Sequence, residues 1–220
     1  MKNDLIIIGA GSVGGHVASN LEDYSSKYNL LGFLDDDETK IEESFVGYSV
    51  LGDIDSIINY PTSISIIIGI AFPTIKFDII KRLKELGFNN YPSLVSSNAW
   101  ISKDTEIGEG CIIYPNTTIN YNCIIDDFVV INMNCGIGHD CRIGDYTSLA
   151  PGVMIGGNTI IGQLSEIGIG SQTIQEISIG HKTTIGAGAV VIKDISDNTV
   201  VVGNPGRIIK KNIKINNNKS

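Results

Sequence analysis

From residue 101 onward, an aliphatic side chain returns at every sixth position of the chain. The series runs from Ile101 to Val191, and fifteen of its sixteen positions are aliphatic, with Thr173 as the exception. A period of six fits neither the 3.6-residue turn of a helix nor the two-residue alternation of an ordinary strand. An unbroken hexad is the signature of a parallel β-helix. The repeat therefore predicts a prism of stacked triangular coils in this part of the chain.

Each hexad is expected to build one flat face and to send one aliphatic side chain inward. Three hexads make one coil, so the sixteen hexads predict about five coils stacked at roughly 4.8 Å, a prism on the order of 25 Å long. The period leaves the handedness open. Glycine often follows the aliphatic residue directly, and we expect these glycines to adopt backbone conformations that side chains resist. They occur at positions 108, 138, 144, 156, 162, 168, 180 and 186.

All four cysteines fall two places before a repeat aliphatic, in a column of small or β-branched residues. Their spacings are whole multiples of the hexad and match no C-x-x-C metal motif. Cysteine also serves as a small buried hydrophobic residue. We therefore expect buried free thiols, and neither a metal site nor disulfides, at Cys111, Cys123, Cys135 and Cys141.

The segment before the hexads, 1–92, follows a different pattern. Apolar runs at 4–8, 29–37 and 63–71 predict three strands, and segments 12–24 and 73–86 between and after them predict two helices. Strands that alternate with helices indicate a small parallel α/β sheet. The second helix carries an apolar stripe of Ile75, Ile79, Leu83 and Leu86. We expect domains at 1–92 and 93–205, followed by a polar tail at 206–220.

The segment "GAGSVG", Gly9 to Gly14, follows the first strand and precedes the first helix, and Asp35 and Asp36 end the second strand. Such glycines let the backbone approach a phosphate at a helix N-terminus, and an acid accepts hydrogen bonds from a ribose or a base. A dinucleotide dehydrogenase is one alternative, but a segment of this length provides only one mononucleotide-binding half. A tight turn without a ligand is another. No G-K-[ST] follows, which excludes an ATPase P-loop.

The overall charge limits the partners. The formal net charge is −8, which argues against nucleic acid and anionic membrane surfaces because either would repel the chain. The longest apolar run, at 64–72, is too short to span a bilayer, and the N-terminal segment shows no signal-peptide cleavage pattern. We expect a cytoplasmic protein with reduced thiols.

In combination, these elements resemble a known family. The segments "IIIGAGSVGGHV", "GFLDDD", "GYSVLGDID", "GIGHDCRIGDYTSLAPGVMIGGNTIIG", "IGAGAVVIKDI" and "VVGNPGRIIK" occur in this order. The chain thereby resembles the bacterial nucleotide-sugar acetyltransferases related to sialic acid O-acetyltransferase and to the N-acetyltransferase of bacillosamine biosynthesis, up to about residue 210. The resemblance implies an α/β Rossmann-like half domain for the nucleotide, an all-β left-handed parallel β-helix, a homotrimer, and acetyl-CoA in the cleft between neighbouring prisms.

The resemblance places the catalytic base at His139 and the acid that increases its basicity at Asp140. The residues support this reading, because a neutral imidazole is suited to accept a proton near pH 7 and an adjacent carboxylate orients it. The alternative is an exposed residue at a corner of the prism. His181, also two places after a repeat aliphatic but without a following acid, represents that alternative.

The same resemblance suggests two sets of binding residues. Close relatives often carry histidine where this chain has Val13 or Ser148. The resemblance therefore does not assign one phosphate contact, at Val13, and one CoA contact, at Ser148. A basic group at Lys210 and Lys211 would meet CoA phosphates or simply remain solvated. The acetyl-CoA set is Ser148, Gly157, Ile169, Ala187 and Arg207, and the nucleotide set is Gly11, Ser12, Val13, Asp35, Asp36 and Lys76.

The expected activity is acetyl-CoA-dependent N-acetylation of the 4-amino group of a nucleotide-linked amino-dideoxy sugar. The amine attacks the thioester directly, and no nucleophilic serine or cysteine is required. Two alternatives stay open: an O-acetyltransferase of sialic acid or a related sugar, and a non-catalytic scaffold that binds nucleotide sugars. The sequence does not choose among UDP, dTDP and GDP carriers.

Overall fold

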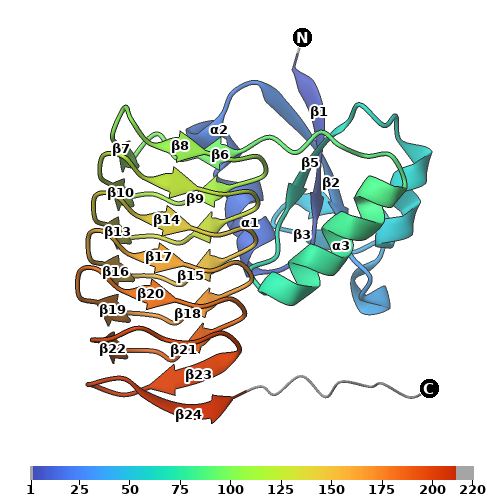
Figure 1. The fold of residues 1–220 in the computed structure, drawn as a ribbon. Helices are drawn as coiled ribbons and strands as arrows, with labels where there is room; N and C mark the ends of the chain where they lie inside the picture. The colour runs from blue at the N-terminus through green and yellow to red at the C-terminus, as the bar shows by residue number, and fades with distance from the viewer. Residues whose placement is uncertain (1, 212–220) are drawn as a thin grey trace, which may run out of the picture.

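The computed structural model describes residues 2–211 and consists of an α/β unit packed beside a triangular solenoid (Figure 1). The α/β unit is built on a parallel three-stranded sheet with the order β2-β1-β5. Its strands are β1 (Asn3–Ile8), β2 (Tyr28–Leu34) and β5 (Ser65–Ile68). The solenoid is a left-handed parallel β-helix. Both halves of the expected fold class are thus confirmed.

Helices and a small hairpin complete the α/β unit. The helix expected over 12–24 is divided at Asn20, whose backbone leaves the helical region and whose Nδ2 donates to the His16 carbonyl at 2.8 Å. The second expected helix is present and starts at a proline. The helical elements are α1 (Ser12–Ser19), α2 (Leu21–Tyr24), α3 (Pro73–Glu85) and the 3-10 turns at Glu38–Lys40 and Ile54–Asn59, and the hairpin is β3 (Ser44–Phe45) with β4 (Tyr48–Ser49).

The buried side of α3 differs from the expected stripe. Of the stripe, Ile75 and Leu86 are exposed, and the helix buries Pro73, Lys76, Ile80 and Leu83. The physical reason is that α3 borders two surfaces at once. Ile75 and Ile79 line a cavity beside the glycine-rich loop, and the neighbouring face, which includes Lys76, is covered by the rest of the protein.

The solenoid has three flat faces, and strands on successive coils pair in register, as Thr118 does with Gly136. The first face contains β6 (Leu94–Val95), β9 (Ile112–Ile113), β12 (Val130–Ile131), β15 (Ser148–Leu149), β18 (Glu166–Ile167), β21 (Thr184–Ile185), β23 (Thr199–Val202) and β24 (Arg207–Lys211). The second face contains β7 (Trp100–Ile101), β10 (Thr118–Ile119), β13 (Gly136–Ile137), β16 (Met154–Ile155), β19 (Gln172–Thr173) and β22 (Val190–Val191). The third face contains β8 (Glu106–Ile107), β11 (Ile124–Ile125), β14 (Arg142–Ile143), β17 (Ile160–Ile161) and β20 (Ser178–Ile179).

The interior of the solenoid is the ladder that the hexad predicts. The repeat aliphatics from Ile113 to Val191 and the apolar residues two places before them form one buried cluster, which includes the four cysteines as free thiols. Ile101 and Ile107 pack against this cluster and are partly buried. Thr173, the exception in the series, is partly buried and satisfies its hydroxyl, because its Oγ1 accepts a hydrogen bond from the Gly156 amide at 2.9 Å.

The corners of the prism require a left-handed backbone, but at a different column from the one expected. Positive φ values recur three places after the repeat aliphatic, for example 56° at Asn122 and 57° at Asp140. The glycines directly after the aliphatics, such as Gly138, have no left-handed φ, and a Cβ on Gly138 would lie 2.5 Å from the Gly157 amide nitrogen on the next coil. Close packing of successive coils, not backbone conformation, therefore requires these glycines.

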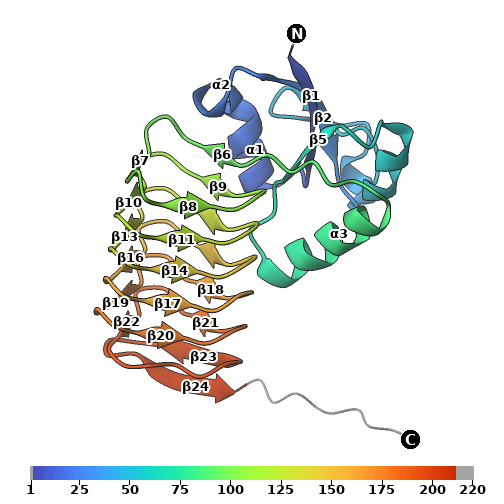
Figure 2. The ribbon, with the colours of Figure 1, turned by 45° about the horizontal axis from the view of Figure 1, so that its top comes forward.

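The α/β unit packs against the first face of the solenoid (Figure 2). On one side of its sheet, residues of α1 such as Val13 and Val17 share a buried cluster with Ile112 and Val130 of the first face. On the other side, Ile80 of α3 belongs to a cluster with Phe128. The first face and its corner with the third face, where Phe128 lies, thus form the docking surface for the α/β unit.

The C-terminal end of the solenoid reaches further than expected. β24 (Arg207–Lys211) pairs antiparallel with β23, so the first residues of the segment assigned to a polar tail belong to the sheet of the first face. The rest of that tail, 212–220, lies outside the described residues. Within residues 2–211, no helix has both the length and the apolar character needed to cross a membrane.

Candidate active site

His139 and Asp140 occupy the corner between the second and third faces, in the turn from β13 to β14. The His139 Nδ1 lies 2.6 Å from the Asp140 Oδ2, and each side chain is about one-third exposed, at 34% and 33%. The hexad places both residues in a corner, where side chains point outward. The structure thus brings the two predicted catalytic residues into direct contact at the surface of the prism.

Residues of the neighbouring coils enclose this pair. The Tyr121 ring stacks on the His139 ring, with centroids 5.3 Å apart and planes inclined by 11°. Asn122 donates from Nδ2 to the Asp140 Oδ1 at 2.5 Å. On the opposite side, a Cβ added to Gly157 would lie 2.8 Å from the His139 Nε2. Sequence reasoning missed Tyr121 and Asn122, although their position one full coil before the pair was a usable signal.

The hydrogen bonds also favour the ionised form of Asp140. The amide of Asn122 and then the ring of His139 hold the pKa of Asp140 below its usual value. An ionised carboxylate only accepts hydrogen bonds, so Nδ1 carries a proton and Nε2 presents its lone pair when the ring is neutral. This arrangement suits Nε2 for general-base chemistry.

The residues expected to hold acetyl-CoA are dispersed over one chain. Gly157 adjoins His139, whereas Ile169 and Ala187 lie on successive coils at the corner between the first and second faces. Ser148 lies on the first face, and Arg207 lies in β24. A single chain therefore does not gather these five residues into one site.

The residues expected to bind the nucleotide do converge, with one exception. A cavity of about 340 Å³ is lined by Gly11, Ser12, Val13, Asp35 and Asp36, together with Lys40 and apolar residues of α3. Gly11 precedes the first turn of α1, and Gly14 packs so closely on the turn that a Cβ would collide with the Gly9 carbonyl oxygen. The glycine-rich turn thus forms one wall of the cavity.

The carboxylates in this cavity already have protein partners. Asp35 accepts hydrogen bonds through Oδ2 from the Ala10 amide at 2.8 Å and from the Lys40 Nζ at 3.0 Å. Asp36 accepts from the Ile54 amide at 2.9 Å and from Arg82 at 3.2 Å. Sequence reasoning missed Lys40, whose pKa is raised chiefly by its hydrogen bond to Asp35.

Lys76 is the exception, because it does not line the cavity. Its side chain is buried between α3 and the solenoid, and its Nζ donates to the Ser148 Oγ at 3.2 Å. The Ser148 hydroxyl in turn donates to the Ala71 carbonyl at 2.5 Å. Burial lowers the pKa of Lys76 to about 7. The structure thus pairs Lys76 and Ser148, which the sequence assigned to two different binding sets, at the junction of the two units.

His181 has a structural role at the corner between the third and first faces. Its Nδ1 accepts a hydrogen bond from the Gln163 amide at 3.1 Å. On other coils the same contact is made by aspartates: Asp145 accepts from the Asp127 amide, and Asp197 accepts from the His181 amide. His181 therefore belongs to a ladder of side chains that cap amides of the preceding coil.

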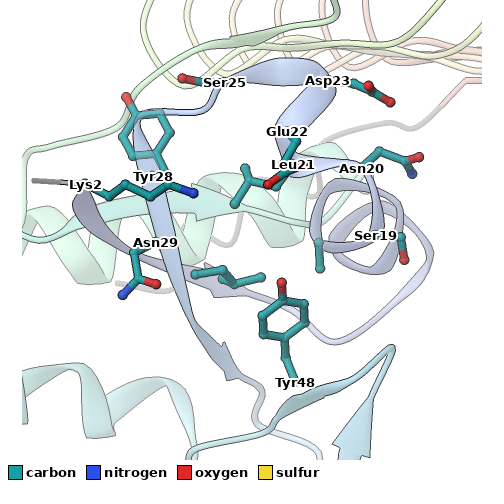
Figure 3. Close-up of a pocket in the computed structure, with 12 residues that line it drawn as sticks. Lys2, Ser19, Asn20, Leu21, Glu22, Asp23, Ser25, Tyr28, Asn29 and Tyr48 are labelled. Atoms are coloured by element: carbon teal, nitrogen blue, oxygen red, sulfur yellow. The ribbon is translucent and has the colours of Figure 1, made fainter.

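A second hollow lies in the α/β unit, away from all of the predicted site residues. It measures about 430 Å³ and is lined by residues of β2, of β4 and of the junction between α1 and α2, among them Tyr28, Tyr48 and Glu22 (Figure 3).

Among residues 2–211, no group of three or more His, Cys, Asp or Glu side chains is placed to hold a metal ion.

The two units match two described families. Residues 4–83 match the PglD N-terminal domain, and residues 122–157 match the bacterial transferase hexapeptide (six repeats). The acetyltransferase domain of PglB from Neisseria gonorrhoeae FA1090 superposes with a TM-score of 0.85 at 29% identity, covering 94% of this chain and 100% of that chain. It has also been solved in complex with acetyl coenzyme A.

Two further solved structures share the whole architecture. WeeI from Acinetobacter baumannii AYE matches with a TM-score of 0.84 at 29% identity, covering 94% of this chain and 100% of that chain. PerB from Caulobacter crescentus, in complex with CoA and GDP-perosamine, matches with a TM-score of 0.84 at 23% identity, over 94% and 98% of the two chains. The chain thus combines a match to the PglD N-terminal domain with a match to the bacterial transferase hexapeptide, in the architecture of solved acetyltransferases.

Proposed function

We propose that this protein is a cytoplasmic, acetyl-CoA-dependent N-acetyltransferase that acts on the 4-amino group of a nucleotide-linked amino-dideoxy sugar. The observation that carries the proposal is the His139–Asp140 pair at 2.6 Å, exposed at a corner of a transferase-type solenoid. The glycine-rich cavity, lined by Asp35 and Asp36, supports an acceptor sugar that the protein binds through an attached nucleotide. The PglB domain, 29% identical, binds acetyl coenzyme A.

In the proposed reaction, His139 Nε2 accepts a proton from the amine as its nitrogen attacks the thioester carbonyl. The new C–N bond replaces the C–S bond, and the imidazolium returns the proton to the departing thiolate. Asp140 stabilises the imidazolium through Nδ1, and Gly157 leaves Nε2 accessible. General-base assistance of this kind raises the reaction rate by a factor of roughly 10² to 10⁴.

The nucleotide would bind in the cavity of the α/β unit. The amides at the start of α1 and the turn at Gly11 favour a phosphate, and Lys40 adds a positive charge at the same cavity. Asp35 and Asp36 provide acceptor oxygens for a ribose or base. Loop contacts in this cavity would select among the UDP, dTDP and GDP carriers.

The placement of the two sites supports a shared active site in a homotrimer. The α/β unit packs on the first face, and His139 lies at the corner between the other two faces. The nucleotide cavity and the base of one chain are therefore on opposite sides of the prism, so a neighbouring copy must bring them together, with acetyl-CoA in the cleft between the copies. Large apolar side chains are exposed on the second and third faces at Trp100, Ile124, Met154 and Ile160.

A direct assay tests the activity. The purified protein is mixed with acetyl-CoA and with UDP-, dTDP- or GDP-linked 4-amino sugars, thiol release is followed with DTNB, and the product mass is measured. We expect thiol release with one carrier and a product heavier by one acetyl group, and less with sialic acid as a hydroxyl acceptor. Binding of a nucleotide sugar without thiol release would support the scaffold alternative instead.

A second measurement tests whether the acetyl group is transferred directly, without a covalent acetyl-enzyme. When the protein is mixed with acetyl-CoA alone, intact-mass spectrometry should show no acetylated protein. A stoichiometric burst of covalent acetyl-enzyme would contradict the mechanism without contradicting the substrate assignment.

A further inference from the structure

We propose that Asn122 is a positioning residue for the base: it orients Asp140, and through Asp140 it selects the tautomer of His139. Asn122 lies one coil before the pair, and the inference rests on the proposed function of His139 as a general base. Neither the hexad nor the similarity to other structures assigns a role to this residue. Three contacts around the pair support this role.

The first contact fixes the carboxylate of Asp140. Its Oδ1 accepts from the Asn122 Nδ2 at 2.5 Å, and its Oδ2 faces the His139 Nδ1 at 2.6 Å. Both oxygens are thus engaged from different sides, which restrains rotation of the carboxylate. An amide can offer only its nitrogen to an ionised carboxylate, so the Asn122 side chain has one productive orientation.

The second contact is made by the backbone and gives the side-chain contact its spacing. Asn122 and Asp140 occupy equivalent positions at the same corner of successive coils, with nearly equal φ values of 56° and 57°. The Asp140 amide donates to the Tyr121 carbonyl at 3.0 Å, which ties the two coils together at this point. Asparagine tolerates left-handed φ better than most side chains, so Asn122 combines the required backbone with a donor.

The third contact restrains the ring itself. The Tyr121 ring stacks on one side of the His139 ring, with centroids 5.3 Å apart and planes inclined by 11°. Gly157 has no Cβ, so the space on the other side of the ring stays open. The ring is thereby oriented by Tyr121, and its protonation site is selected by Asp140. With Nδ1 carrying the proton, Nε2 is the nitrogen that can accept one from a substrate.

Removal of the Asn122 amide should therefore act on turnover and not on binding. Asp140 would be held at one oxygen only, and the neutral ring would populate both tautomers, of which one has no acceptor at Nε2. We expect Asn122→Gly, which keeps the left-handed φ accessible, to lower kcat about tenfold, part of the general-base contribution. The KM values for acetyl-CoA and for the nucleotide sugar should stay within about twofold, since the residue is proposed to orient the base and not to bind substrate.

Asn134→Gly is the matched control. Asn134 has a φ of 59° at another corner of the same coil as Asp140, so it undergoes the same change in backbone freedom without touching the pair. We expect wild-type kcat for this variant, and a melting temperature somewhat higher than that of Asn122→Gly, which also loses the hydrogen bond to Asp140. An equal fall in kcat for both would overturn the proposal, because it would show a general loss of rigidity.

An NMR measurement separates this inference from the proposed function. The ¹⁵N shifts of the three histidine rings are recorded at pH 8.5 on protein without substrate. We expect a single Nδ1–H tautomer for His139 in the wild type and in Asn134→Gly, and tautomer averaging in Asn122→Gly. A single tautomer retained in Asn122→Gly would overturn the positioning role whether or not the protein transfers acetyl groups. Averaging in a protein without activity would support the positioning of the ring and count against the proposed function alone.

Discussion

Lys76 of α3 donates a hydrogen bond from its Nζ to the Ser148 Oγ, 3.2 Å away on the first face of the solenoid. The two residues are 72 positions apart in the chain and belong to different structural units. The lysine side chain is 1% exposed. A buried ammonium has lost most of its hydration, and one serine hydroxyl replaces only part of it. This contact therefore joins the two units at a cost in stability that depends on pH.

The first prediction concerns that pH dependence. Burial lowers the pKa of Lys76 from 10.5 to about 7, so between these values the unfolded chain binds the extra proton. Stability should rise with pH from about 7 toward 10.5, and the penalty should be complete below pH 7. Each unit of lowered pKa corresponds to about 1.4 kcal/mol. We expect Lys76→Met to raise the free energy of unfolding at pH 6 and to remove its rise between pH 7 and 8.5.

Urea denaturation at several pH values measures this effect. Lys81→Met is the control, because Lys81 lies on the same helix with its side chain 64% exposed. This variant should keep the pH profile of the wild type. If Lys76→Met and wild type gained stability equally between pH 7 and 8.5, the ammonium of Lys76 would not be the source of the slope.

The second prediction concerns the base. His139→Ala should lower kcat by roughly 10² to 10⁴, because general-base assistance accounts for a factor of that size. Acetyl-CoA affinity, measured by calorimetry, and the oligomeric state, measured by light scattering, should change little. Thiol release at the wild-type rate from this variant would remove His139 from the mechanism.

The third prediction separates two glycines that touch each other. The backbone of Gly157 has no left-handed φ, so alanine can adopt its conformation. An added Cβ would, however, lie 2.8 Å from the His139 Nε2. Gly157→Ala should therefore lower kcat and leave the melting temperature nearly unchanged, since a side chain can move aside. A Cβ on Gly138 would meet backbone atoms of the next coil at 2.5 Å, so Gly138→Ala should lower the melting temperature.

Steady-state kinetics and thermal unfolding of both glycine variants test this prediction. The expected pattern is a loss of activity without a loss of stability at Gly157, and a loss of stability at Gly138. A wild-type kcat in Gly157→Ala would mean that the space beside Nε2 is not used in the reaction.

The fourth prediction concerns His181, whose Nδ1 accepts a hydrogen bond from the Gln163 amide. Aspartate makes this contact elsewhere in the same ladder, as Asp145 does. His181→Asp should therefore retain the stability of the wild type, whereas His181→Ala should lose about 1 kcal/mol. Both variants should keep normal kcat, as checked by denaturation and by the DTNB assay. A large fall in kcat in His181→Asp would give this residue a part in the reaction.

Much of the solenoid could be predicted from the sequence because its contacts are periodic. The inward column from Ile101 to Val191, the buried cysteines and the three-hexad coil all follow from one count of six. The same count places Asn122 over Asp140. It does not say that the two side chains meet, because that depends on rotamers and on the left-handed corner. The glycines at positions such as 138 were located correctly and explained wrongly, since the spacing between coils is set only in three dimensions.

The α/β unit could be predicted less completely, because its packing is not periodic. Its strands and most of its helices follow from apolar runs and from glycine and proline signals. The buried side of α3 does not, since Ile75 would ordinarily be counted as core and Lys76 as surface. The neighbour that covers Lys76 is the first face of the solenoid, where Ser148 stands 72 positions further along the chain.

The amino-acid sequence by itself thus determined the β-helix repeat, the glycine-rich turn and the adjacency of His139 and Asp140, because each depends on residues close in the chain or related by a fixed period. The tertiary structure alone decided that Lys76 and Ser148 meet, and that the cavity and the pair lie on opposite sides of the prism. These relationships arise from the docking of two independently patterned units, and the complementarity of their surfaces is not encoded in any local repeat.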